Sequence, residues 1–180
     1  GITGLYEQMP KASFDFLISN YDFSNTVLEG KTKNYKIYNK SGIKIGVFGL
    51  GIELEGLVTK ELYKETKYLD PIEISRDISN KLKFEENCDL IICLSHLGYK
   101  YDNLPERICD YNLAKKSNHI DLIIGGHTHT FMEKPIVLKN EKGNDVIINQ
   151  VGCFGLCLGQ IDFFFDRNNK RSFSSSVLKI

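Results

Sequence analysis

Two short apolar runs, at 89–94 and 120–124, each lead into a turn that carries histidine. The first turn, Ser-His-Leu-Gly, contains His96, and the second, Gly-Gly-His-Thr-His, contains His127 and His129. Runs of this length and composition are typical of strands buried on both faces of a parallel sheet. Because sites in such sheets lie outside the carboxyl ends of the strands, we expect these histidines to lie close together.

These histidines are candidate metal ligands. Neutral imidazole is the commonest metal-ligating side chain, and the pair Gly125-Gly126 lets the backbone turn sharply beside a ligand. The alternative is that each histidine merely ends a strand and hydrogen-bonds to nearby backbone. That alternative suits a single histidine. The equivalent placement of His96, His127 and His129 after two similar strands favours a metal site.

The composition is that of an ordinary folded protein without a dominant charge. The chain has 180 residues, 42% hydrophobic and 26% charged, which is enough for one domain with a core. Lys+Arg and Asp+Glu both number 23, so we expect neither nucleic acid nor an anionic membrane surface as a partner. The sequence contains no apolar run long enough to span a bilayer.

The five cysteines cannot all pair within one chain. Cys88 and Cys93 lie beside or within an apolar run, where a free cysteine behaves as a small hydrophobic residue. Cys153 and Cys157 could add soft ligands to a metal, and a zinc protein of unrelated class, with these cysteines around its metal, is therefore an alternative.

The remaining pattern predicts an α/β fold with a largely parallel sheet, followed by antiparallel structure. Asp70 and Pro71 are expected to open a helix. Asp102 and Asn103 are expected to cap a later one, Asn20 to end a strand, and His119 to lie at the surface. The predicted strands are 14–20, 34–38, 43–50, 89–94 and 120–124, then 134–138 with 145–150 and 159–166 with 172–180; a second helix is predicted at 103–117.

Several motifs together resemble the metallophosphatase (calcineurin-like phosphoesterase) domain of the bacterial 5′-nucleotidase family. They are the turns 95–98 and 125–129, then 149–152 followed by 158–162, with weaker matches at 16–21 and 45–50. They occur in family order and cover nearly the whole chain. The resemblance implies an α-β-β-α sandwich with mixed sheets and a dinuclear site for two divalent ions, such as zinc or manganese. It also implies hydrolysis of phosphate monoesters, with nucleotides as the substrates.

The sequence departs from the family in one respect. The Asp-x-His, Gly-Asp and Gly-Asn-His motifs of the family do not occur in it. We therefore expect residues 1–180 to form a single partial domain, the C-terminal half of the metallophosphatase domain, without the nucleoside-binding domain of many relatives. The resemblance assigns His96 and His127 to one metal and His129 to the other. It places the remaining ligands and the general-acid histidine outside this chain.

These expectations limit what the chain can do alone. We expect no catalytic residue within it, at most one bound ion, and little or no turnover, and substrate-binding residues are not identified. An incomplete sheet would expose an edge, so self-association is expected. The resemblance implies a periplasmic or cell-surface location, and the five cysteines, which argue against a strongly oxidising compartment, leave a cytoplasmic location as the alternative. The alternative function is a non-catalytic metal- or ligand-binding module that has lost its catalytic half.

Overall fold

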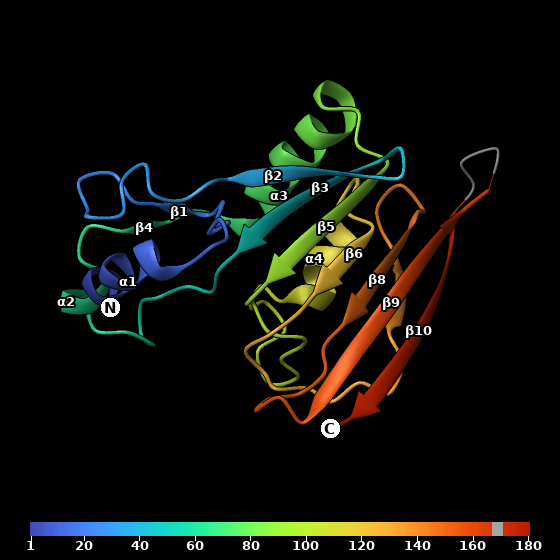
Figure 1. Ribbon diagram of the computed structural model, residues 1–180. Helices are drawn as coiled ribbons and strands as arrows, with labels where there is room; N and C mark the ends of the chain where they lie inside the picture. Colours follow the sequence, from blue (N-terminus) through green and yellow to red (C-terminus); the bar gives the residue numbers. More distant parts are fainter. Residues whose placement is uncertain (167–170) are drawn as a thin grey trace.

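A six-stranded sheet forms the centre of the computed structural model, which describes residues 1–166 and 171–180 (Figure 1). Its strand order is β2-β3-β5-β6-β8-β7. Strands β3, β5, β6 and β8 are parallel, and β2 and β7 flank them antiparallel. The mixed α/β class is therefore confirmed. The strands are β2 Tyr35–Lys40, β3 Ile43–Leu50, β5 Leu90–Ser95, β6 Leu122–Ile124, β7 Ile136–Lys139 and β8 Asp145–Asn149.

Two helices cover one face of this sheet: α3, Pro71–Asn80, and α4, Asp110–Lys116 (Figure 1). Asp70 caps α3 as expected, because its Oδ1 accepts hydrogen bonds from two backbone amides of the first turn. A π-helical turn, Lys81–Glu85, extends α3. The core between helices and sheet is built from alternate strand residues and one stripe of each helix, among them Phe48, Ile91, Cys93, Ile123, Ile148, Ile72, Leu82 and Leu113.

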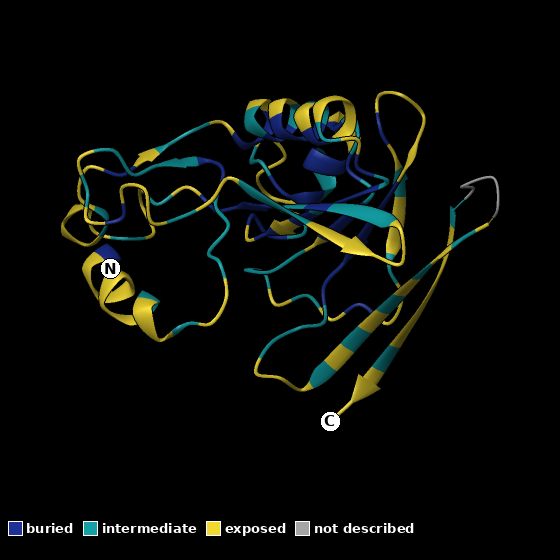
Figure 2. Ribbon diagram, turned by 45° about the horizontal axis from the view of Figure 1, so that its top comes forward, coloured by how far each residue is buried: buried dark blue, intermediate teal, exposed yellow. Residues whose placement is uncertain are grey.

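A separate hairpin faces the other side of the sheet. It consists of β9, Cys157–Phe165, and β10, Arg171–Lys179, and its predicted turn 167–170 lies outside the described residues. No residue of either strand is buried, as Figure 2 shows. Among the described residues the two strands pair only with each other, so the hairpin has two free edges.

A cavity of about 1110 Å³ lies between the hairpin and the sheet. Most of its walls are apolar: Ile45, Ile92 and Ile124 project from the sheet, and Ile161 and Phe163 from β9. Asn149, Gln150 and Asp162 are among its polar lining residues. Ile124 is 44% exposed although it belongs to a central strand. Parallel strands normally have both faces covered. Within the described residues this apolar sheet face is therefore covered only in part: Leu90 and Leu122 are buried, whereas Ile124 is exposed.

The segment 1–70 corrects one expectation. Residues 14–20 do not form a strand; only Leu17 makes an isolated bridge, with Lys33. Asn20 is fully buried and bonds both backbone groups of Gly51, which replaces strand pairing at this point. The elements of the segment are α1 Ile2–Gln8, η1 Met9–Lys11, α2 Lys60–Tyr63, and the short pair β1 Tyr21–Asp22 with β4 Lys67–Tyr68.

The helix predicted at 103–117 is shorter than expected and begins only at Asp110. Pro105 disfavours helical backbone in the residue before it, and the chain from 102 to 107 forms turns instead. The expected cap by Asp102 and Asn103 is therefore wrong, because Cys109 occupies the cap position. Asp102 instead pairs with Lys100 at 2.8 Å. In the ranges that the structure describes, no helix has the length and hydropathy needed to cross a bilayer.

Candidate metal centre

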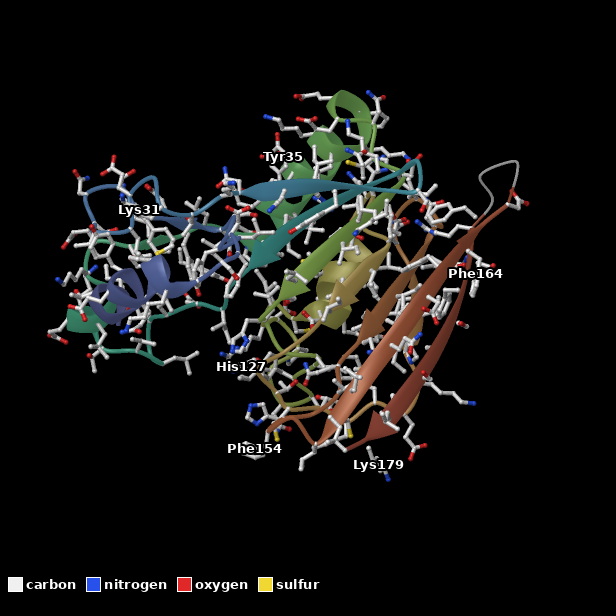
Figure 3. All side chains as sticks on the ribbon, viewed as in Figure 1. Lys31, Tyr35, His127, Phe154, Phe164 and Lys179 are labelled. Carbon is white, nitrogen blue, oxygen red and sulfur yellow. The ribbon has the colours of Figure 1, made fainter. Side chains whose placement is uncertain are left out.

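Two loops at the carboxyl edge of the sheet carry the candidate ligands. The loop after β5 holds His96, and the loop after β6 holds His127 and His129. The rings of His96 and His127 lie 5.2 Å apart between centroids, edge to face. The ring of His129 faces Phe154, at 6.0 Å. Figure 3 shows His127 beyond the end of the sheet, with Phe154 on the neighbouring loop.

The second loop has an unusual backbone. His127 and His129 have φ values of 69° and 52°, in the left-handed region that side chains rarely adopt. A Cβ on Gly126 would lie 2.9 Å from His96 Nδ1, so a side chain there would press on the ring. Such strained conformations cluster at functional sites, where the surrounding structure maintains them. The loop therefore has features of a site as well as of a turn.

Burial and neighbouring charges lower the pKa values of His96 and His127. Burial lowers the pKa of His96 below its usual value, and the nearby His129 lowers it further. Burial also lowers the pKa of His127, together with the neighbouring His96, Arg107 and His129. A histidine must be deprotonated to bind a metal. His96 and His127 are therefore predominantly neutral near pH 7 and able to donate a lone pair.

Within residues 1–166 and 171–180, no group of three or more His, Cys, Asp or Glu side chains is arranged to hold a metal ion. This includes Cys153 and Cys157, which are free and half-buried. The donor chemistry of His96 and His127 suits a divalent ion, and their rings are adjacent. His96 and His127 could therefore supply two ligands of a metal site. The ring of His129 contacts Phe154 instead and does not complete a metal-binding group with them among the described residues.

Gln150 is the residue that the sequence did not reveal. It directly follows β8 and is only 2% exposed. Its Nε2 donates to Gly126 O at 2.7 Å, and its Oε1 accepts from Thr130 N and, at 3.2 Å, from Thr128 Oγ1. One buried amide thus holds the loop that carries His127 at three points. In the sequence it stood beside a predicted strand end and within the motif 149–152, and neither signal gave it a role.

Removing this amide is expected to destabilise the fold. Gln150→Ala leaves Thr130 N and Gly126 O without their partner, and each unsatisfied buried group costs about 1–3 kcal/mol. We expect the free energy of unfolding to fall by about 3 kcal/mol in urea denaturation. The matched control is Gln160→Ala on exposed β9, which should change it by less than about 0.5 kcal/mol. Equal losses in both variants would refute the role of Gln150.

The two histidine loops are also bonded to each other, because Tyr99 N donates to Thr128 Oγ1 at 3.0 Å. Within the His96 loop, Tyr101 Oη donates to Leu97 O at 2.8 Å. A cavity of about 420 Å³ opens beside His96, at the carboxyl ends of β3, β5 and β6. Its walls are otherwise mostly apolar and include Leu94 and Ile124. His119 lies elsewhere, in contact with Lys142 and Phe84.

Known proteins resemble this chain in sequence and in fold. The trifunctional nucleotide phosphoesterase protein YfkN of Bacillus subtilis is 34% identical over 146 residues, which are 81% of this chain and 9% of YfkN. A 5′-nucleotidase of Vibrio parahaemolyticus is 32% identical over 191 residues, 95% of this chain and 33% of that protein. The structure of a 5′-nucleotidase precursor from Thermus thermophilus matches with a TM-score of 0.80 and 26% identity. That match covers 98% of this chain and 36% of the other. No protein-family model matches the chain.

The class is a mixed α/β protein whose fold matches solved 5′-nucleotidase and calcineurin-like phosphoesterase structures. The chain is homologous to the 5′-nucleotidases and YfkN-type metallophosphoesterases, and spans about a third or less of the length of these relatives. The resemblance stated from the two histidine motifs is therefore confirmed at the level of family and fold.

Proposed function

We propose that this chain is the histidine-bearing part of a metal-dependent phosphohydrolase that acts on nucleotide phosphate monoesters. One observation carries the proposal: His96 and His127, on separate loops, meet edge to face at 5.2 Å beyond the carboxyl ends of two parallel strands. Homology to 5′-nucleotidases supports nucleotides as the substrate class. An exported location follows by the same analogy and stays a prediction.

The chain's own residues would hold the metal and keep it in place. His96 and His127 would bind one divalent ion, and His129 would bind a second after turning from Phe154. Bound divalent ions would supply a hydroxide near neutral pH and stabilise charge on the phosphate. Zinc and manganese both suit imidazole ligands. Gln150 would fix the loop on which two of these ligands sit.

The remaining ligands are proposed to come from outside these 180 residues. Two divalent ions on imidazoles alone would repel each other without bridging carboxylates, so this chain alone would hold at most one. The apolar sheet face and the cavity beside His96 are both open. A complementary β-structured segment seated on that face would cover it and could bring carboxylates to the histidines. Residues 1–180 would then be one part of a single metallophosphatase domain.

A second candidate is a metal- or ligand-binding module without catalysis. The observation that favours it is the lack of any complete metal-binding group among the described residues. The two candidates share His96 and His127 as ligands. They differ in whether a complementary segment makes the site hydrolytic.

A complementation assay separates the two candidates. This chain would be co-expressed with the part of the Vibrio parahaemolyticus 5′-nucleotidase that precedes its matched segment, and purified as a complex. We expect manganese- or zinc-dependent hydrolysis of an aryl phosphate and a nucleoside 5′-monophosphate by the complex. Neither polypeptide alone should turn over either substrate. A stable complex that binds metal yet hydrolyses neither would favour the non-catalytic module, and robust turnover by the chain alone would contradict the partial-site account.

A further inference from the structure

Asp110 is a buried carboxyl that is attached to the loop of His96. It is the first residue of α4 and has no exposed surface. Its Oδ1 accepts a hydrogen bond from Ser95 Oγ at 2.5 Å, and its backbone N donates to Gly98 O at 2.8 Å. Ser95 and Gly98 bracket the turn that carries His96. This turn is therefore tied to one residue at both of its ends.

The second carboxyl oxygen of Asp110 faces the other histidine loop. A Cβ built on Gly125 would lie 2.3 Å from Asp110 Oδ2, so the carboxyl packs directly against the backbone of Gly125. Gly125 begins the turn that carries His127. Asp110 Oδ2 is buried and has no hydrogen-bond partner among the described residues. The side chain of Asp110 therefore contacts both loops, in addition to the hydrogen bond between Tyr99 and Thr128.

A simple helix-capping role does not account for this arrangement. An acidic residue in the first turn of a helix is favourable when exposed, and it need not be buried. Burial raises the pKa of Asp110 to about 7, so keeping the carboxyl here disfavours its charged form. Within the same turn, Ser95 Oγ also accepts from Leu97 N at 3.1 Å, which extends the connection beneath His96.

The geometry points to Asp110 as a positioning residue that holds the His96 turn against the His127 turn and so sets the separation of the two imidazoles. The purpose of that separation, metal binding, rests on the proposed function. The separation of the two imidazoles can be measured in the chain without metal. The two can therefore be tested separately.

The test uses NMR spectroscopy of the metal-free chain with isotope-labelled histidines, followed by titration with zinc. The first readout is the nuclear Overhauser contact between the rings of His96 and His127, and the second is the dissociation constant for zinc. Asp110→Leu keeps the approximate volume and removes the acceptor, whereas Asp110→Asn keeps an acceptor for Ser95. The matched control is Asp121→Leu, because Asp121 also accepts a backbone hydrogen bond, from Ile91 N at 2.7 Å, but at the opposite end of β6.

We expect Asp110→Leu to lose the ring contact and to weaken zinc binding about 10- to 100-fold, the usual effect of losing support behind a ligand. Asp110→Asn should restore most of both, and Asp121→Leu should lower stability while leaving both readouts unchanged. If Asp110→Leu keeps the ring contact, the inference is overturned. If the wild-type chain binds no zinc, the proposed metal site fails, and the ring contact still decides the role of Asp110. If Asp110→Leu does not fold, Ser95→Ala replaces it, and an unchanged ring contact in that variant overturns the inference.

Discussion

His127→Ala is expected to lower kcat/KM of the complemented protein for a nucleoside 5′-monophosphate by about 1000-fold, or about 4 kcal/mol of transition-state stabilisation. The reason is that the variant removes an imidazole that meets His96 at 5.2 Å and would bind the same ion. Steady-state kinetics at saturating manganese measures the loss. The metal must be saturating, because incomplete occupancy of a weakened site would itself lower kcat/KM.

His119→Ala is the matched control for that measurement. This histidine lies near the start of β6, in contact with Lys142 and Phe84, and not at the carboxyl edge of the sheet. Its removal should change kcat/KM less than about twofold. A His127→Ala variant with the kinetics of His119→Ala would mean that the histidine pair takes no part in the reaction.

The isolated chain is expected to self-associate through the uncovered part of its sheet face. Ile124 is 44% exposed on a central strand, and the cavity between sheet and hairpin is mostly apolar. Burying an aliphatic side chain contributes about 1.5–3 kcal/mol. Ile124→Lys should therefore weaken association about 10- to 100-fold, because each factor of ten corresponds to about 1.4 kcal/mol. Sedimentation velocity over a range of micromolar concentrations measures the change.

Leu104→Lys provides the control for this experiment. Leu104 is 54% exposed but does not line the cavity. This variant should associate as the wild type does. A wild-type chain that stays monomeric with a cooperative melt would show that the uncovered face is tolerated and needs no partner. That result would remove the main support for a complementary segment.

The sequence predicted the sheet well where local pattern and tertiary role agree. The runs at 89–94 and 120–124 contain most of β5 and all of β6, because their apolar residues pack on both faces of the sheet. The histidine loops follow these two strands, as expected. The cap of α3 by Asp70 depends on short-range chemistry that the sequence displays directly. The predicted alternation of strands and helices agrees with the parallel pairing of β3 with β5 and of β5 with β6.

Long-range bonds explain what the sequence did not predict. Residues 14–20 have strand-like composition, but Asn20 instead bonds the backbone of Gly51, and no local pattern reports such a contact. Asp110 and Gln150 support the histidine loops through atoms of distant residues, so no local pattern reveals this role, although Gln150 lies in the motif 149–152. The orientation of His129 toward Phe154 likewise depends on a loop far along the chain.

Metal titration of the chain and its histidine variants tests the central claim most directly. Cobalt is a suitable probe, because its visible absorption reports imidazole binding without any need for catalysis. The account predicts one cobalt ion per chain, with affinity lowered at least about tenfold by His96→Ala and by His127→Ala, and unchanged in His119→Ala. Wild-type, His96→Ala and His127→Ala chains that bind cobalt with equal affinity would contradict it.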